Sequence, residues 1–205
     1  MILRCGCSFL PPLLSLACVV STLMSRRFQS EQWVPAPVER VFAFFANPHN
    51  LPRIMPPGMG TKLVKLNLVP PRFSAGHVPL GTLRMAGAGT EMTVAFRVLP
   101  YLPVHERWIV DITSFELNRY FHDTQKQGPF RRWEHTHRFE PMMQGEREGT
   151  LIRDEVEYEV GFGIVGRTLE TVLFQRLFRA TFNHRKRVVE QIFARQSLTA
   201  SSAVS

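Results

Sequence analysis

A helical pattern about 30 residues long, from 167 to 196, closes this chain and constrains its fold more than any other segment. Its apolar residues mostly recur on one helix face: Leu169, Val172, Leu173, Leu177, Ala180, Val188, Val189, Ile192 and Phe193. At a rise of 1.5 Å per residue this helix is about 45 Å long, enough to cross an entire small sheet. A flat sheet would leave its apolar ends bare, whereas a strongly curved sheet can grip it.

Strand-like segments, separated by proline and glycine, precede this helix. They lie at 28–34, 61–69, 90–98, 104–115, 119–127, 132–140 and 149–160. Two short helices are expected between the first two strands, at 38–47 and at about 51–55. Pro37 suits the first helical position, and Pro56-Pro57 ends the second helix. Residues 70–89 have the composition of a long loop. The short links between the later strands indicate an antiparallel meander.

This order of elements predicts an α+β helix-grip fold. We expect a curved antiparallel sheet of about six to seven strands wrapped around the long C-terminal helix. The two short helices would follow the first strand. Such an arrangement encloses a cavity between the sheet and the helix, which is a common place for a small-molecule site.

The composition is that of one domain with an extension at each end. A chain of 205 residues can bury a sizeable core, and we place this domain at 28–196. Residues 197–205 are small and polar, which predicts a disordered tail. All three cysteines, Cys5, Cys7 and Cys18, lie in the N-terminal extension 1–27, so the domain has no cysteine-based site.

The N-terminal extension has three interpretations. Its uncharged run from Cys5 to Ser25 is compatible with a secretory signal or a membrane anchor. In the third interpretation the start is mis-called and translation begins at Met24. Arg26-Arg27 after the run favour a cytoplasmic body. We therefore expect a cytoplasmic protein, with a membrane-anchored or exported one as the alternative.

Three stretches resemble a known superfamily. They are VERVFAFFANPHNLPRIMPP at 38–57, FHDTQKQGPFRRWEHTHRFEP at 121–141 and GTLIRDEVEYEVGFG at 149–163. The chain is similar in these stretches to the START/Bet v 1-like superfamily, also called SRPBCC or polyketide cyclase/dehydrase, and in particular to its bacterial ligand-binding members. The resemblance covers about 28–195 and implies a pocket for a hydrophobic small molecule, often without known catalysis. Gly161 departs from the proline that is usual there, and 1–27 has no counterpart.

Alternation along the strands separates an inward face from a charged outward face. On 132–140, Trp133, His135, His137 and Phe139 oppose Arg132, Glu134, Thr136 and Arg138. We expect the aromatic and histidine set to point into the pocket, because the charged set suits solvent. The same rule applied to the other strands gives these candidate ligand-binding residues: Glu106, Trp108, Asp123, Gln125, Trp133, His135, His137, Phe139, Asp154 and Tyr158.

These residues allow three interpretations: proton transfer, a structural cluster or a metal site. A buried histidine next to Asp123 or Asp154 would be held in one tautomer and shuttle a proton, as cyclisation or dehydration requires, and we take His135 and Asp154 as the candidate catalytic pair. Alternatively, the imidazoles and carboxylates satisfy one another as a structural cluster. His-x-His also places two imidazoles on one side of a strand, where Glu106, Asp123 or Asp154 would complete a metal site. This motif alone is weak, and we expect no metal.

The sequence contains few motifs that would indicate a cofactor or a macromolecular partner. No glycine-rich phosphate loop is present, so we expect no cofactor. The net charge of +8 favours acidic partners, and His184-Arg185-Lys186-Arg187 is a basic run. This run lacks the stacking aromatics of an RNA-binding surface, so we expect no nucleic acid and interpret it as solvated charge on the outer helix face. Peripheral membrane contact through 1–25 or the basic helix stays open, as does the oligomeric state.

The sequence thus predicts a protein that binds a hydrophobic or amphipathic small molecule, such as a lipid, an isoprenoid quinone or a polyketide-like compound. The alternative is a cyclase or dehydratase that uses His135 as general acid or base in the same cavity. The cluster of Phe42, Phe44 and Phe45 is expected to pack in the core.

Overall fold

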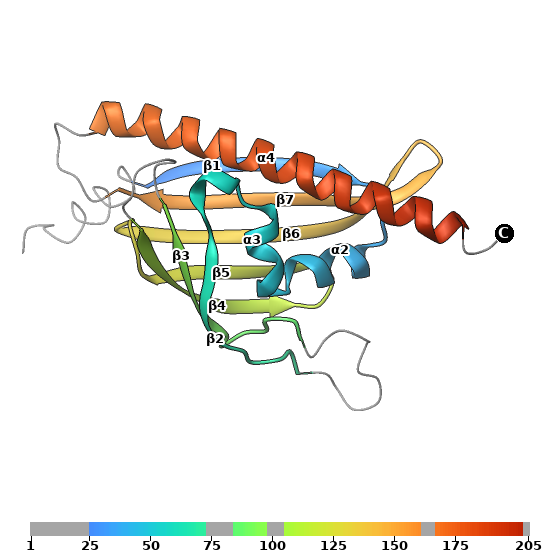
Figure 1. Cartoon of the computed structure of the whole chain (residues 1–205), viewed down its shortest axis with the longest axis horizontal. Coiled ribbons are helices and arrows are strands. Elements are labelled where there is room, and N and C mark those ends of the chain that lie inside the picture. Colours follow the sequence, from blue (N-terminus) through green and yellow to red (C-terminus); the bar gives the residue numbers. More distant parts are fainter. Residues whose placement is uncertain (1–24, 73–83, 98–104, 161–166, 203–205) are drawn as a thin grey trace, which may run out of the picture.

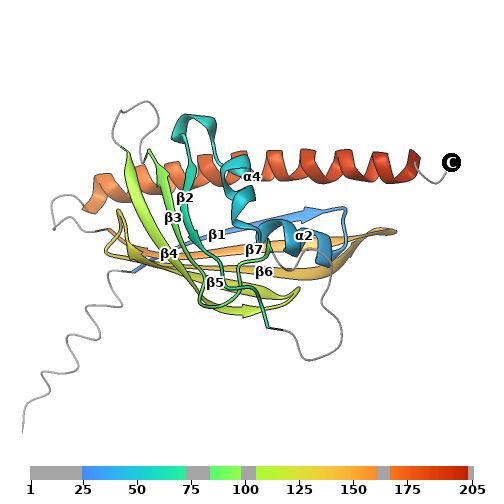
Figure 2. The ribbon, with the colours of Figure 1, turned by 60° about the horizontal axis from the view of Figure 1, so that its bottom comes forward.

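The computed structural model describes residues 25–72, 84–97, 105–160 and 167–202, with backbone alone for 167–172 and 195–202. Within these ranges a seven-stranded antiparallel sheet carries the fold, in the order β1-β7-β6-β5-β4-β3-β2. Its strands are β1 (Arg26–Val34), β2 (Lys62–Asn67), β3 (Glu91–Phe96), β4 (Glu106–Glu116), β5 (Tyr120–Gln127), β6 (Arg132–Gln144) and β7 (Arg147–Glu159). The curved sheet that the sequence predicts is confirmed (Figures 1 and 2).

The helices all lie on one side of this sheet (Figure 2). They are α2 (Val38–Phe45), α3 (Leu51–Ile54) and α4 (Arg167–Ser202), with single 3₁₀ turns at Pro48–Asn50 and Pro57–Met59. Pro37 precedes the first turn of α2, and Glu39 lies in that turn, where the helix dipole favours a negative charge. The side chain of Asn47 accepts a hydrogen bond from the backbone N–H of His49, which starts the next turn.

The two chain ends of the domain differ from the expectation. The helix α4 does not end at 196 but continues to Ser202, because no glycine or proline interrupts residues 197–202. The prediction of a disordered tail is therefore wrong for these six positions. At the other end β1 begins at Arg26 rather than at 28. Residues 1–24, which contain the three cysteines, lie outside the described residues, as do most of the expected loop 70–89 and Gly161.

The hairpin of β6 and β7 is longer than the sequence analysis expects. The two strands pair from Arg132 with Glu159 as far as Gln144 with Arg147, and Gly145 turns the chain with a φ of 63°. This left-handed conformation costs glycine little. Within the described part of the chain, no helix is long and apolar enough to cross a membrane.

Two apolar clusters flank a polar zone along β6. One contains Phe139 and is centred on Phe42, whose ring meets the Phe139 ring edge-on at 5.1 Å between centroids. The other contains Trp133 together with Phe178 and Phe182 of α4. His135 and His137 occupy the two inward positions between these clusters. The fold thus places its polar inward side chains in the middle of a hydrophobic interior.

Candidate functional site

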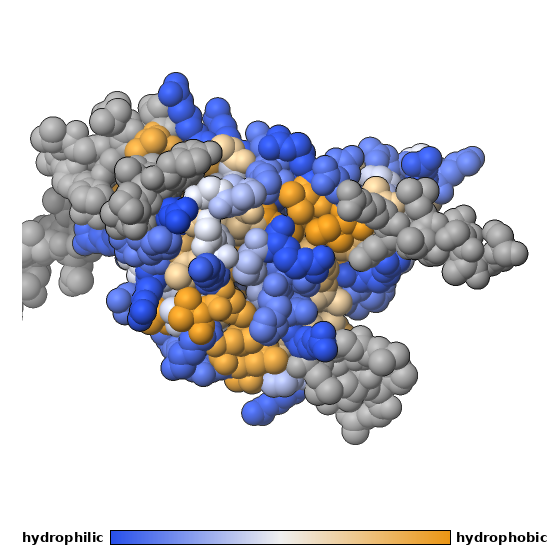
Figure 3. All heavy atoms as spheres, in the orientation of Figure 1, coloured by the Kyte–Doolittle hydropathy of each residue, from blue (hydrophilic) through white to orange (hydrophobic). Residues whose placement is uncertain are grey.

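A cavity lies between the concave face of the sheet and the helices. The space between its walls amounts to about 1290 Å³ when the open solvent at its mouth is counted. Strands β3 to β6 supply its floor, and α2, α3 and α4 supply its roof. Apolar side chains also gather at the surface on this side of the molecule, between α4 and α2 and over β2 (Figure 3). A concave, mostly apolar space with few polar groups is the usual form of a small-molecule site.

The polar residues of the cavity wall are few. They are Asn50, Thr61, Asp123, His135, His137, Thr181 and Arg185. Among the described residues Thr61 Oγ1 and Trp108 Nε1, both from the wall, are buried without a hydrogen-bond partner. Buried polar atoms normally have a partner. These two atoms therefore depart from the usual pattern.

Strand alternation and register bring the central polar residues together. The inward residues of β6 from Trp133 to Phe139 are buried, and Asp123 of β5 pairs directly with His135. On the other side of β6, His137 pairs with Asp154 of β7. Three adjacent strands thus each contribute an inward polar side chain at the same level of the sheet. Asp123, Asp154 and both histidines are only 5–8% exposed.

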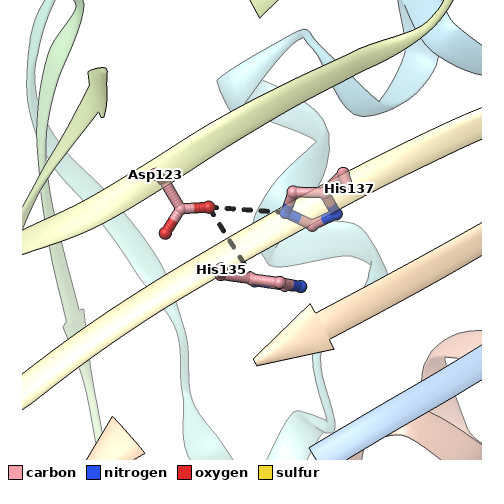
Figure 4. Close-up of side chains that lie close together, drawn as sticks. All are labelled: Asp123, His135 and His137. Carbon is pink, nitrogen blue, oxygen red and sulfur yellow. Dashed lines mark ion pairs between the residues drawn. The ribbon is translucent and has the colours of Figure 1, made fainter. Parts of the chain in front are cut away.

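The two imidazoles lie next to each other between the two carboxylates, with their planes tilted by 40°. Their ring centroids are 3.8 Å apart. The Nε2 of His135 is hydrogen-bonded to Asp154 Oδ1 at 2.9 Å. The Nδ1 of His137 lies 2.7 Å from the same oxygen, without the alignment of a hydrogen bond. On the opposite side, Asp123 Oδ2 lies 3.8 Å from His135 Nδ1 and 3.4 Å from His137 Nε2 (Figure 4).

Arg185 of α4 completes this cluster from the roof of the cavity. The side chain is only 8% exposed, and its guanidinium lies 3.8 Å from Asp154 Oδ1. The guanidinium also stands over the ring of Phe182, at 4.7 Å from the centroid. The interpretation of residues 184–187 as a solvated outer face is therefore wrong for Arg185. This residue lies on the buried stripe of α4 with Phe178, Phe182 and Val189, three to four residues apart, so helical periodicity could have identified it.

Burial and charge act in opposite directions on the acids. Burial alone would raise the pKa of Asp154, but the nearby Arg185 and both imidazoles hold this pKa well below its usual range. Burial would likewise raise the pKa of Asp123, and the two histidines together with the Trp133 indole lower it. Both carboxyl groups are therefore ionised at neutral pH.

The two histidines titrate differently. Burial, followed by the charge of His137, lowers the pKa of His135 despite its hydrogen bond to Asp154. Burial also opposes protonation of His137, but the carboxylates of Asp123 and Asp154 outweigh it and raise the pKa of His137. The cluster thus favours one proton on His137 and a neutral His135. Two carboxylates, one imidazolium and Arg185 then balance to zero charge.

Five of the candidate residues predicted from the sequence line the cavity: Trp108, Asp123, Trp133, His135 and His137. Asp154 lies behind the histidines and positions them. The other four do not line the cavity. Phe139 and Tyr158 pack in the two apolar clusters, and Glu106 begins β4 partly exposed. The side chain of Gln125 donates to the backbone oxygen of Phe130, at 2.6 Å, and so holds the turn before β6.

Several cavity residues escaped the sequence analysis. Phe44 and Phe45 of α2 line the cavity, although they were expected only in the core. Phe178, Thr181 and Phe182 contribute from α4. The alternation of side chains along a strand identifies its inward positions, but it does not predict which helix residues pack over those positions. The roof residues therefore required the three-dimensional structure.

Comparisons with known proteins agree with this architecture. The chain matches the family model "Polyketide cyclase / dehydrase and lipid transport" over residues 34–187. No curated protein matches the chain. Among solved structures, the protein TTHA0849 from Thermus thermophilus is 20% identical with a TM-score of 0.58, over 84% of this chain and 99% of that chain. A START superfamily protein from Mycobacterium smegmatis is 13% identical with a TM-score of 0.53, over 83% of this chain and 98% of that chain.

Norcoclaurine synthase from Thalictrum flavum, solved in complex with dopamine and hydroxybenzaldehyde, is also similar. It is 12% identical with a TM-score of 0.51, over 92% of this chain and 95% of that chain. Likeness at these identities shows a shared fold alone. The family match, in contrast, spans most of the sequence, and the chain therefore belongs to the polyketide cyclase/dehydrase and lipid transport family.

Proposed function

We propose that this protein binds one hydrophobic or amphipathic small molecule, such as a lipid, an isoprenoid quinone or a polyketide-like compound, in the cavity between the sheet and α4. The observation that supports this most is the contrast within the wall. Aromatic and aliphatic side chains surround most of the space, while Asp123, His135 and His137 form one compact polar patch on its floor. The apolar body of a ligand would lie along the aromatic wall, and its polar head would face this patch.

The charge balance of the patch favours a neutral or weakly polar head group. Asp123 and Asp154 are offset by Arg185 and one imidazolium, so a fully charged head would enter a buried site without a counter-ion. Burying an unpaired charge is costly. A hydroxyl or carbonyl group, in contrast, finds both donors and acceptors here.

A binding titration with a neutral apolar fluorophore tests this proposal. N-phenyl-1-naphthylamine should bind the purified full chain with an increase in its emission. Thr181 is 7% exposed and lines the cavity, so Thr181→Trp should fill part of the space and weaken binding at least about tenfold. Asn183→Trp puts the same side chain on the exposed face of α4 and serves as the control. Equal affinity of the two variants would place the probe outside the cavity and contradict the proposal.

A second candidate function is cyclisation or dehydration with His135 as general base. The specific support is geometric, since His135 lines the cavity while Asp154 holds its Nε2 at 2.9 Å. The lowered pKa keeps this imidazole neutral and able to accept a proton through Nδ1. A protein of this fold, norcoclaurine synthase, has been solved with two small aromatic molecules bound.

The variant His135→Gln separates the two functions. An enzyme that uses this imidazole would lose about 10²–10⁴-fold in turnover of a polyketide-like substrate while still binding it. A pure binding protein would show a changed affinity and no turnover in either form. Turnover that survives in His135→Gln would remove His135 from the catalytic role.

A further inference from the structure

The inner side of the histidine cluster has a gap that hydrogen bonds do not close. Asp123 Oδ2 lies 3.4 Å from His137 Nε2 and 3.8 Å from His135 Nδ1 (Figure 4). An N–H···O bond is normally about 2.7–3.2 Å long. Because His135 Nε2 is bonded to Asp154, the Nδ1 of a neutral His135 presents a lone pair toward the gap. A carboxylate oxygen and two imidazole nitrogens thus converge on one point.

The outer atoms of the same three side chains are held by neighbours. Trp133 Nε1 donates to Asp123 Oδ1 at 3.2 Å, which leaves Oδ2 directed at the gap. Asp154 Oδ1 lies 2.9 Å from His135 Nε2 and 2.7 Å from His137 Nδ1. Arg185 in turn lies beside Asp154. Carboxylates behind metal-binding histidines fix the ring orientation in this way, and metal-binding carboxylates are themselves hydrogen-bonded.

The geometry points to a binding site for a divalent first-row transition metal ion, with Asp123 Oδ2, His135 Nδ1 and His137 Nε2 as its ligands. One ligand atom from each residue falls within 4.8 Å of the others, so small side-chain rotations suffice to close on an ion with bonds of about 2.0–2.2 Å. All three residues line the cavity, so the remaining coordination positions face the space where an organic ligand would lie. This inference does not depend on the nature of that ligand.

The donor set selects the class of ion. Two imidazoles with one carboxylate suit Zn²⁺ or Fe²⁺, whereas Mg²⁺ and Ca²⁺ prefer oxygen ligands. With both imidazoles neutral, Asp123, Asp154 and Arg185 carry a net charge of 1 − 2 = −1. A dication would leave the buried cluster at +1. An anionic oxygen, such as a hydroxide or the enolate or phenolate of a bound molecule, would neutralise it as the outer ligand.

Metal titration of the full chain tests this site. The experiment uses protein stripped with a chelator and carrying Cys5→Ser, Cys7→Ser and Cys18→Ser, because thiolates also bind zinc. We expect one equivalent of Zn²⁺ per chain by calorimetry, no binding of Mg²⁺, and an intense visible band when Co²⁺ replaces Zn²⁺. A parallel titration with Fe²⁺ without oxygen distinguishes between the two favoured ions.

Matched variants locate the bound ion. His137→Gln should weaken Zn²⁺ binding at least about 100-fold and abolish the Co²⁺ band. His122→Gln is the control, since His122 lies on β5 beside Asp123 but bonds Thr136 at 2.8 Å. Asp123→Asn should behave like His137→Gln, and circular dichroism establishes that each variant is folded. If Asp123→Asn does not fold, the comparison of His137→Gln with His122→Gln decides whether the ion binds at this site.

Two results would overturn the metal site. One is the lack of stoichiometric Zn²⁺, Fe²⁺ and Co²⁺ binding by the stripped protein, and the other is equal affinity of His137→Gln and His122→Gln. Neither result bears on the fluorophore titration, which is carried out in the presence of a chelator. Failure of the metal site and failure of the proposed ligand binding are therefore separate outcomes.

Discussion

The buried carboxylate of Asp154 should be the most costly single charge to remove from this domain. Its Oδ1 faces His135 Nε2 at 2.9 Å, His137 Nδ1 at 2.7 Å and Arg185 at 3.8 Å. Asp154→Asn keeps the shape of the side chain but leaves Arg185 and the imidazolium of His137 buried without this counter-ion. Removing one partner of a buried ion pair lowers the free energy of unfolding by about 3–5 kcal/mol.

This loss converts directly into a shift of a urea unfolding curve. With a slope of about 2 kcal/mol per molar urea, the midpoint of Asp154→Asn should fall by about 1.5–2.5 M. A domain near the middle of the usual range of roughly 5–15 kcal/mol would be less stable but still folded in water. The control is Glu155→Gln, the next residue on the opposite face of β7, for which we expect a change of less than about 0.5 kcal/mol. Equal midpoints for the two variants would refute the buried charge network.

The pH dependence of the same pair gives a second check. The pKa of Asp154 is depressed in the folded protein, so its contribution is complete above the unfolded value of 3.8 and is lost as pH falls through the folded pKa. The stability difference between wild type and Asp154→Asn should therefore shrink in strong acid, as pH falls below the unfolded value of 3.8. A difference that grows in that acid range would contradict this assignment.

Three further perturbations test separate parts of the structure. The pKa of His137 is raised in the folded protein, so protonation of His137 stabilises the fold fully below the unfolded value of 6.5, and this stabilisation is lost as pH rises through the folded pKa. In wild type the urea midpoint should therefore fall as pH rises through this pKa, and His137→Gln should not show this decrease. Arg185→Met should destabilise the fold by about 3 kcal/mol, since Asp154 then keeps a buried charge without its cation, and a neutral effect in urea unfolding would contradict its structural role. Gly149→Ala should lower the thermal midpoint by several degrees, because the added Cβ would lie 2.4 Å from the backbone oxygen of Val34; an unchanged midpoint would argue against this close approach of β1 and β7.

The sequence allowed the sheet and its inward faces to be predicted because both depend on local periodicity. His135 and His137 alternate with Glu134 and Thr136, and this pattern alone predicted that the imidazoles are buried. The long helical stripe predicted the layer that covers them. These patterns predict the structure correctly because each one is repeated over many neighbouring positions in the sequence.

The composition of the cavity wall could not be predicted in the same way. Phe139 shares a strand face with His137, yet α2 packs over it and removes it from the cavity. Arg185 was assigned to a basic run, although its helical phase places it with Phe182. Both outcomes depend on where helices cross the sheet, which is set by contacts distant in sequence. Strand register likewise brings Asp123 and Asp154 to opposite sides of the histidines.

Mass spectrometry of the full chain, purified without detergent, examines whether the cavity holds a hydrophobic or amphipathic small molecule. We expect a native mass that exceeds the denatured mass by one small molecule, and an organic extract that contains this molecule with an apolar body and a neutral polar head. Thr181→Trp should lose the extra mass, whereas Asn183→Trp should keep it. Retention of the same extra mass by Thr181→Trp would show that the molecule binds elsewhere and would refute binding in the cavity.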